Sequence, residues 1–367
     1  MKLAEFTART KPVLASISLL LFAIGIISAP LKADNIFENY TLGEGIRFSD
    51  IHVSGYTTIE GAIPRDGESE LLIDDVSLFV NARFNRFFNP FFEAEVAAVP
   101  IAVEGNSLFS GTNARFVLER LYNDSHLTDK LTLRLGKSLA PIGEWNSVHA
   151  GPLVATTTRP ISTRRVFSEF VSGASLIYSP HSEALPVVTA YWQPEGQLAH
   201  DPDILENRHF RDIKGFNLAW EWGFSNKFGV SFQKADSGQL ETPFQSNSVA
   251  DEHQYLLGLN VHLVKGPFDL QSEFVHVWLT DPLPSRARNN ETGIFVQGLY
   301  NLNDNWALMS RYEYFQDRDF LDNSQNALFG IKYSPKPPLV WKLEYVKQWG
   351  EEFSISTGLI ASLAVLF

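Results

Sequence analysis

The sequence predicts an all-β protein, a transmembrane antiparallel up-and-down β-barrel of about 16 strands. Three observations support this prediction. Apolar residues recur at every second position, the alternating segments are about ten residues long, and short connections alternate with longer ones. Period two is the spacing of a strand, whereas a helix would show spacings of three and four. A tilted strand needs about 9–11 residues to cross a bilayer.

Composition excludes several classes of protein. The 367 residues include no Cys, so a disulfide framework, a thiolate zinc site and an iron–sulfur cluster are excluded. Lys and Arg number 30 against 42 Asp and Glu, a formal net charge of −12 that argues against a nucleic-acid partner. An aromatic share of 13% is too high for a disordered chain.

Residues 1–33 are expected to be a secretory signal peptide, and residues 34–367 a single barrel domain. Lys2, Arg9 and Lys11 give the chain a positive start, and an apolar run follows them. That run is shorter than the ~20 residues of a spanning helix, so cleavage is favoured over an uncleaved anchor. Export past the inner membrane follows from this interpretation.

Sixteen alternating segments follow the signal peptide. In one of them the apolar face is formed by Leu339, Trp341, Leu343 and Tyr345. The expected strands are residues 46–57, 71–84, 91–103, 114–123, 130–138, 169–178, 186–193, 213–223, 227–235, 253–264, 268–278, 292–301, 305–315, 326–334, 339–348 and 354–367.

The connections indicate where these strands lie. Those after even-numbered strands are short, most others are longer, and residues 139–168 form the longest. A sheet in lipid must close on itself, because no water satisfies its edges. Bacterial outer-membrane barrels have tight periplasmic turns and longer extracellular loops. The sequence therefore predicts an outer-membrane barrel, with a soluble all-β sandwich pair or propeller as the alternative.

The last expected strand alternates up to the terminal residue, Phe367. This ending resembles the C-terminal strand signature of outer-membrane barrels. The resemblance implies that the barrel-assembly machinery is a partner that reads Phe367. Outer-membrane lipid and lipopolysaccharide are the other partners expected at that location.

A barrel of 16–18 strands leaves an aqueous channel. The expected function is therefore passive diffusion of small hydrophilic solutes or ions. Residues 139–168 contain Trp145, Val148, Leu153 and Val154, an apolar content that favours packing against an inner wall. Their placement resembles the third extracellular loop of sixteen-strand porins, which implies a loop that folds into the lumen and constricts the pore.

Residues 133–145, LRLGKSLAPIGEW, place Gly-x-x-x-x-Pro-x-Gly after a strand. This passage is similar to one in the phosphate-selective porin O/P group of Gram-negative outer-membrane porins. That resemblance implies anion-selecting counterparts at Arg159, Arg164, Arg165 and Lys137, and a homotrimer. The chain departs from the group in its acidic charge and in lacking a long arginine ladder.

Strand parity is expected to point further charges into the lumen, among them Arg134, Glu93, Glu95 and Glu119. If the loop arginines face these carboxylates, a transverse field crosses the constriction, and such charged rings select solutes. The alternative is that the charges pair with one another and hold the loop in place. The sequence leaves both open.

An enzyme is not expected, because GxSxG, P-loop and zinc-binding spacings are missing from the sequence. No cofactor or metal is expected for the same reason. The alternative function is a substrate-specific uptake barrel or a surface receptor or adhesion protein. Aromatic residues along the lumen would favour that alternative, and Phe79 and Phe91 are the clear inward candidates.

Overall fold

The computed structural model describes residues 40–367 except 111–113, 149, 200–207, 224, 240–251, 352 and 354–355. The expected signal peptide lies outside the described residues. Two short strands, β1 (Tyr40–Thr41) and β2 (Gly45–Phe48), precede sixteen longer ones. These are β3 (Ile51–Pro64), β4 (Glu70–Ala82), β5 (Pro90–Val103), β6 (Arg115–His126), β7 (Leu131–Leu139), β8 (Phe170–Tyr178), β9 (Val187–Gln193), β10 (Arg208–Trp222), β11 (Asn226–Gln239), β12 (Glu252–Lys265), β13 (Phe268–Thr280), β14 (Asn290–Asn301), β15 (Trp306–Gln316), β16 (Ser324–Lys336), β17 (Leu339–Gly350) and β18 (Gly358–Leu366).

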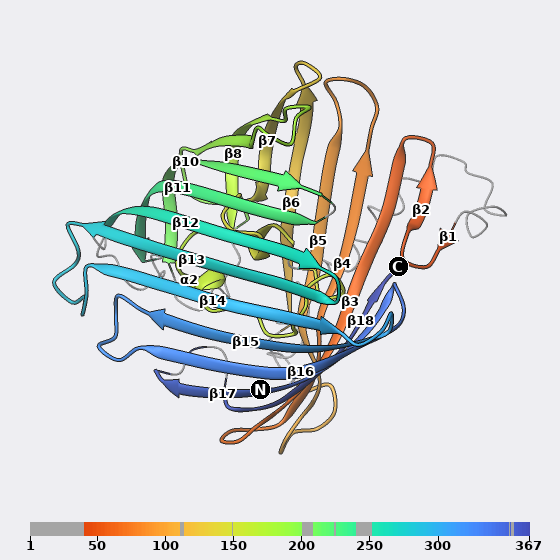
Figure 1. Ribbon diagram of the computed structural model, residues 1–367, viewed down its shortest axis with the longest axis vertical. Helices are drawn as coiled ribbons and strands as arrows, with labels where there is room; N and C mark the ends of the chain where they lie inside the picture. Colours follow the sequence, from red (N-terminus) through yellow and green to blue (C-terminus); the bar gives the residue numbers. More distant parts are fainter. Residues whose placement is uncertain are drawn as a thin grey trace, which may run out of the picture.

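The sixteen long strands form one closed antiparallel barrel (Figure 1). Each strand pairs with its neighbour in the sequence, and β18 pairs with β3 to complete the ring. Phe367 extends this seam, because its N–H and C=O both bond to Gly55 at 2.8 Å. Its ring lies where a side chain on Gly55 would point. Closure removes the open sheet edge that lipid would leave unsatisfied, and the predicted fold class is confirmed.

The first expected strand, residues 46–57, is wrong in its extent. The chain breaks there into β2 and β3, because Ser49 adopts a left-handed backbone with φ 50°. The paired strand then continues to Pro64, seven residues beyond the expected end at residue 57. Periodicity does not reveal this turn, since the residues on both sides keep an alternating pattern.

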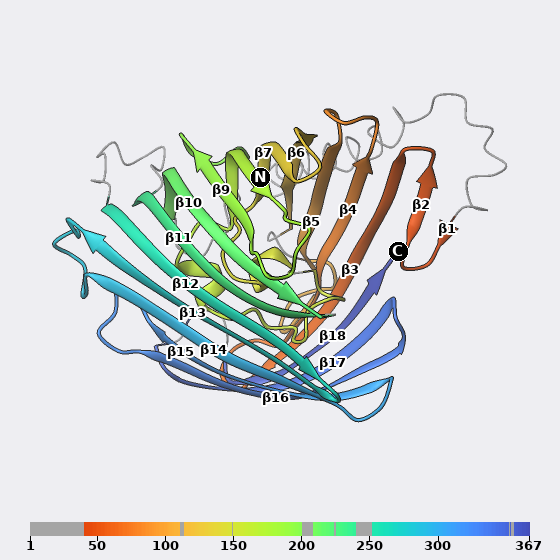
Figure 2. The ribbon, with the colours of Figure 1, turned by 45° about the horizontal axis from the view of Figure 1, so that its top comes forward.

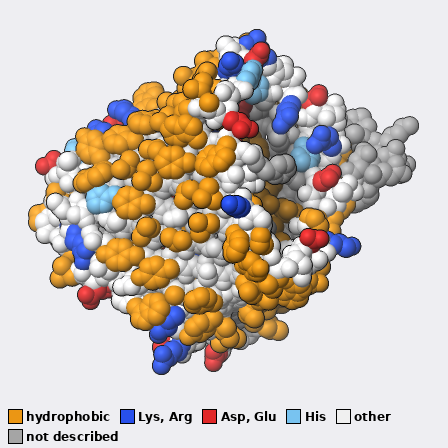
Figure 3. All heavy atoms as spheres, in the orientation of Figure 1, with side chains coloured by type: hydrophobic (Ala, Val, Ile, Leu, Met, Phe, Trp, Pro, Cys, Tyr) orange, Lys and Arg blue, Asp and Glu red, His pale blue; other side chains and the backbone are white. Residues whose placement is uncertain are grey.

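The outer face of the barrel is apolar. On β15, Trp306, Leu308 and Tyr312 point outward and are 39–48% exposed, whereas Arg311 and Glu313 point inward and are buried. Figure 3 shows orange hydrophobic side chains over much of the visible outer surface. Such a face matches hydrocarbon rather than water. Among the described residues, no helix is both long and apolar enough to span a membrane.

Aromatic rings gather at the ends of the strands that meet in short turns. Trp306 stacks on Tyr333 with centroids 4.3 Å apart, and Phe268 contacts Tyr300 at 5.0 Å. All four rings lie within a few residues of the turns that join β12 to β13, β14 to β15 and β16 to β17. This is the placement of an interfacial aromatic belt.

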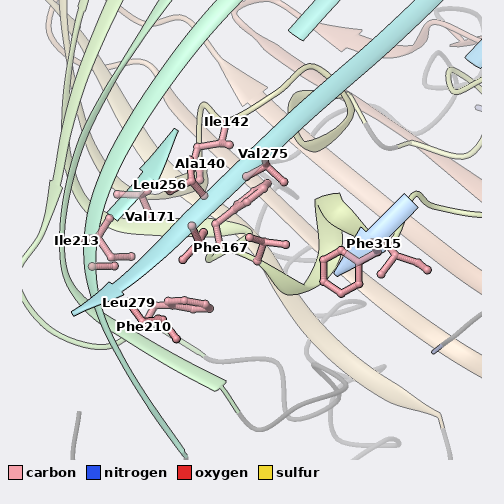
Figure 4. Packing of buried hydrophobic residues seen from close by; sticks show 14 of the residues in the cluster. Ala140, Ile142, Phe167, Val171, Phe210, Ile213, Leu256, Val275, Leu279 and Phe315 are labelled. Carbon is pink, nitrogen blue, oxygen red and sulfur yellow. The ribbon is translucent and has the colours of Figure 1, made fainter. Parts of the chain in front are cut away.

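Residues 140–169, between β7 and β8, enter the barrel and carry the short helix α2 (Ser162–Arg165) (Figure 2). Their apolar side chains form a core with the inner wall (Figure 4). Ile142, Val166 and Phe167 from this loop are 0–4% exposed, and they share the cluster with residues such as Leu256 and Val277. Burying a large apolar side chain contributes about 1.5–3 kcal/mol, so this core fixes the loop against β10–β15.

Candidate functional site

Buried carboxylates on the inner wall hold the backbone of residues 140–169. Glu273 accepts hydrogen bonds from the N–H groups of Glu144 at 2.8 Å and Trp145 at 2.7 Å. Glu313 accepts one from Ile161 at 2.9 Å. The loop has little regular secondary structure, so its buried N–H groups need such acceptors. Charged acceptors make these bonds stronger than neutral ones.

Two cations from the wall hold the middle of the loop. Arg311 donates to Thr158 O at 2.6 Å and to Thr156 Oγ1 at 2.6 Å. Lys342 Nζ donates to Gly151 O at 2.7 Å and to Thr156 O at 3.2 Å. These residues come from β15 and β17, so the loop continues around the lumen beyond the apolar core.

The loop also reaches the strand that closes the barrel. Thr157 Oγ1 lies 2.7 Å from Ser362 Oγ on β18. A Cβ placed on Gly151 would lie 2.3 Å from Thr58 Oγ1 on β3, so a larger residue at this position would force the Thr58 side chain to move. Residues 140–169 therefore touch the wall from β13 to β3 and divide the lumen at this level.

We call the part of the lumen where the loop packs against β10–β15 the filled side. A network of charges lies there, at the strand ends near the longer loops. Arg208 and Arg318 both bind Glu291, at 2.8 and 2.5 Å, and Arg165 binds Asp317 at 3.1 Å. Arg318, Glu291 and Asp317 have fully buried side chains. Burial lowers the pKa of Arg165 to about 10, so it remains a cation at neutral pH.

A cavity of about 550 Å³ remains between the loop and the wall of β3–β6, β17 and β18. Nine acidic side chains line it: Glu60, Asp66, Glu68, Glu70, Asp74, Asp75, Glu95, Glu119 and Glu169. Four basic side chains line it: Arg115, Arg159, Arg164 and Lys342. Burial lowers the pKa of Arg164, and the neighbouring positive charge of Arg159 adds to that effect. The cavity is thus acidic on balance, with two basic groups on the loop and two on the strands of the wall.

The structure brings four of the predicted site residues to this cavity. Arg159, Arg164, Glu95 and Glu119 all line it. Arg159 also pairs with Glu169 at 2.5 Å and donates to Thr163 O at 2.7 Å. That arginine therefore holds the loop as well as facing the cavity.

The other predicted site residues lie elsewhere. Lys137 is fully buried and donates to Leu118 O at 2.6 Å and Ala199 O at 3.0 Å. Arg165 lies in the buried charge network, and its guanidinium stacks 4.1 Å from the Phe353 ring. Arg134 forms two 2.8 Å bonds to Asp124, and Glu93 pairs with Arg120. These four residues are not among the side chains that line the cavity.

Two β-bulges change the inward-facing parity along β4 and β6. Between β3 and β4, Thr58 pairs with Asp75 and Ile59 with Ile73, which leaves Asp74 as the extra residue. Between β5 and β6, the extra residue is Glu119. A bulge sets two residues against one partner and re-aims a side chain. The neighbours Asp74 and Asp75 can therefore both line the cavity. Two adjacent acidic residues in one strand were the sequence feature that could have indicated this bulge.

The inner wall also carries a row of aromatic rings on β3–β6. Tyr56 lies 5.6 Å from Phe79, Phe79 lies 6.3 Å from Phe91, and Phe91 stacks on Tyr122 at 5.1 Å. The sequence predicted Phe79 and Phe91 as inward and missed both tyrosines. Tyr56 also lines the cavity, so the row begins at the acidic wall.

These features define a porin-type barrel, a closed sheet of sixteen strands whose lumen is divided by the third long loop. No family model and no curated protein matches the chain. Solved structures do match. They include OmpT of Vibrio cholerae in its trimer form (TM-score 0.60, 12% identity, 86% of this chain and 99% of that chain). Others are OmpF of Salmonella typhi in complex with daunomycin (0.60, 13%, 86% and 97%) and an anion-selective porin of Comamonas acidovorans (0.57, 10%, 86% and 98%).

At these identities the matches show the fold alone. The predicted likeness to sixteen-strand outer-membrane porins is confirmed at that level. The narrower resemblance of residues 133–145 to the phosphate-selective group stays a prediction. Among the described residues, no group of three or more His, Cys, Asp or Glu could hold a metal ion.

Proposed function

We propose that this protein is an outer-membrane channel for passive diffusion of small hydrophilic solutes and ions, and not an enzyme. The observation that carries the proposal is the polar cavity of about 550 Å³ inside a closed barrel with an apolar exterior. Apolar outside and polar inside is the arrangement of a membrane barrel that conducts through its lumen. The porin-like fold of the matched structures supports the same conclusion.

The loop of residues 140–169 is proposed to form the constriction. Its apolar side packs on β10–β15, which leaves the passage beside β3–β6. Its hydrogen bonds to Glu273, Glu313 and Arg311 support a rigid position. A fixed loop gives a pore of constant size.

The charges of the cavity favour cations over the anion preference expected from the arginines. Nine acidic side chains face four basic ones there. Arg159 has Glu169 as its ion partner, and Arg165 has Asp317. An excess of one sign in a pore raises the local concentration of the opposite ion. Mild cation preference is therefore the proposed selectivity.

A homotrimer is the proposed assembly. An apolar groove of about 650 Å³ lies on the barrel near β3–β5, β17 and β18, and small residues such as Gly61, Ala102 and Ala361 line it. Small side chains permit close approach of a second copy, and one matched structure is named as a trimer form. Lipopolysaccharide and the assembly machinery, acting at Phe367, remain proposed partners.

Reversal potential in a planar bilayer under a KCl gradient tests the channel. Stepwise conductance with potassium preference would support both the channel and the acidic cavity. Chloride preference would overturn the charge assignment and restore the loop arginines as selecting groups. Absence of conductance from correctly folded barrels would overturn the channel proposal.

A substrate-specific uptake barrel is the second candidate. The aromatic row from Tyr56 to Tyr122 favours it, because stacked rings offer a binding surface that a simple diffusion pore does not need. Saturation of solute flux at increasing concentration would distinguish this candidate from passive diffusion.

A further inference from the structure

The wall of β3–β6 combines carboxylates with aromatic rings on its inner face. Asp75 and Glu95 lie on β4 and β5 and line the cavity. Phe79 and Phe91 lie on the same two strands, on the same inner face. Carboxylates attract cations by charge, and ring faces attract them through the quadrupole of the π-system.

The carboxylate of Asp75 is a candidate anchor for a cationic donor. Asp75 lines the cavity next to Thr58, which is 4% exposed and whose side chain hydrogen-bonds that carboxylate. Charged acceptors form stronger hydrogen bonds than neutral ones, so this pair offers a polar contact to a donor on a solute.

The protein's own cations already occupy the rings beyond the cavity. The guanidinium of Arg120 lies 4.6 Å from the Phe91 centroid and 5.7 Å from that of Phe79. The guanidinium of Arg134 lies 4.0 Å from the Tyr122 centroid. Within this wall, an aromatic ring and a carboxylate hold the same guanidinium in two places. Arg120 contacts Phe91 and pairs with Glu93, and Arg134 contacts Tyr122 and pairs with Asp124.

We propose that the β3–β6 wall binds organic cations, meaning solutes with a guanidinium or primary ammonium group on a short aliphatic chain. The cationic group would sit among Asp75, Glu95 and Thr58, and the aliphatic part would contact Tyr56 and the adjoining rings. This inference rests on the proposed channel function and names its preferred solute class. Inorganic cations share the attraction of the carboxylates but gain little from the rings, because they keep their hydration shells.

The test is block of single-channel current by agmatine, which has a guanidinium and an amine joined by four carbons. Succinate serves as an anionic solute and 1,4-butanediol as a neutral one. The measurement uses the refolded full barrel at about 0.1 M KCl, where the Debye length is ≈10 Å. Agmatine is expected to block at a concentration at least about tenfold lower than either control, the equivalent of 1.4 kcal/mol.

Three isosteric or near-isosteric variants locate the site. Asp75→Asn and Glu95→Gln are each expected to raise the half-blocking concentration of agmatine about tenfold, and Phe79→Leu about threefold. Glu183→Gln is the matched control, because this exposed carboxylate lies in the connection between β8 and β9, outside the cavity. It should leave block unchanged. Circular dichroism confirms that each variant is folded.

The outcomes separate the two proposals. A barrel that conducts KCl but is blocked equally by agmatine and succinate would overturn the organic-cation site and leave the channel standing. Unchanged block in both Asp75→Asn and Glu95→Gln would overturn it as well. A folded barrel without any KCl conductance would overturn the channel proposal itself.

Discussion

The two sides of the lumen are built from the same alternating strands, but charges are paired on one side and left in acidic excess on the other. On the side of β10–β15, the loop is packed by an apolar core, and buried arginines meet buried carboxylates, as in the group of Arg208, Arg318 and Glu291. On the side of β3–β6, acidic side chains outnumber basic ones around an open cavity. Charges that are paired with one another stabilise the fold, whereas carboxylates in excess over basic groups remain available to a solute.

The largest expected effect is a loss of stability when the buried ion network on the side of β10–β15 is disrupted. Glu291→Ala removes the carboxylate shared by Arg208 and Arg318 and leaves two buried cations without it. Loss of one member of a buried ion network costs about 3–5 kcal/mol. The free energy of unfolding in urea should fall by that amount, with current noise rising as the loop loosens. Glu183→Ala, at an exposed carboxylate in the connection between β8 and β9, should change stability by less than about 0.5 kcal/mol. A Glu291→Ala channel with unchanged unfolding free energy and unchanged current noise would show that this charge network does not hold the loop.

A smaller loss of stability is expected from the apolar core. Val166 is fully buried between the loop and the wall. Val166→Ala removes two methyl groups and leaves a small void, which costs about 2 kcal/mol. Unfolding in urea measures this loss. Cation preference should stay the same, because the open side is untouched, and a change in preference would show that the two sides are coupled.

A change in selectivity without a change in stability is expected from the open side. The double variant Glu95→Gln and Glu119→Gln removes two negative charges from the cavity wall. The ratio of potassium to chloride permeability should fall about threefold, which corresponds to less than 1 kcal/mol. Reversal potentials measure the ratio. A ratio equal to that of the parent barrel would remove these carboxylates from the conducting path.

The smallest effect is a dependence on salt. The Debye length shortens from ≈10 Å at 0.1 M to about 3 Å at 1 M ionic strength. Cation preference should weaken over this range, because the wall charges are screened. A cation preference that persists unchanged at high salt would indicate direct binding of the ion to the wall rather than a general electrostatic field.

Strand periodicity predicted the barrel well, since outward residues such as Leu308 and inward residues such as Arg311 follow strict alternation. It failed at the bulges. One extra residue, Asp74 in β4 or Glu119 in β6, shifts the face on which the next residue lies. Such bulges depend on the partner strand, so one segment read alone does not reveal them.

The loop shows a second limit of sequence reasoning. Arg159, Arg164 and Arg165 are near one another in the sequence, and all three were predicted at the constriction. The short helix α2 turns Arg165 toward Asp317, while Arg164 faces the cavity. Their separation follows from helical geometry, in which adjacent residues point in different directions. That helix has only four residues and lacked a pattern that would predict it.

Water and ions are expected to pass beside β3–β6 and not beside β10–β15. The chain contains no Cys, so single cysteines can report the path directly. Asp74→Cys places a thiol on the cavity wall, and Val277→Cys places one in the buried core. A charged methanethiosulfonate reagent is added while single-channel current is recorded. We expect a lasting current decrease for Asp74→Cys and no change for Val277→Cys. Modification of Val277→Cys with an unreactive Asp74→Cys would contradict this expectation.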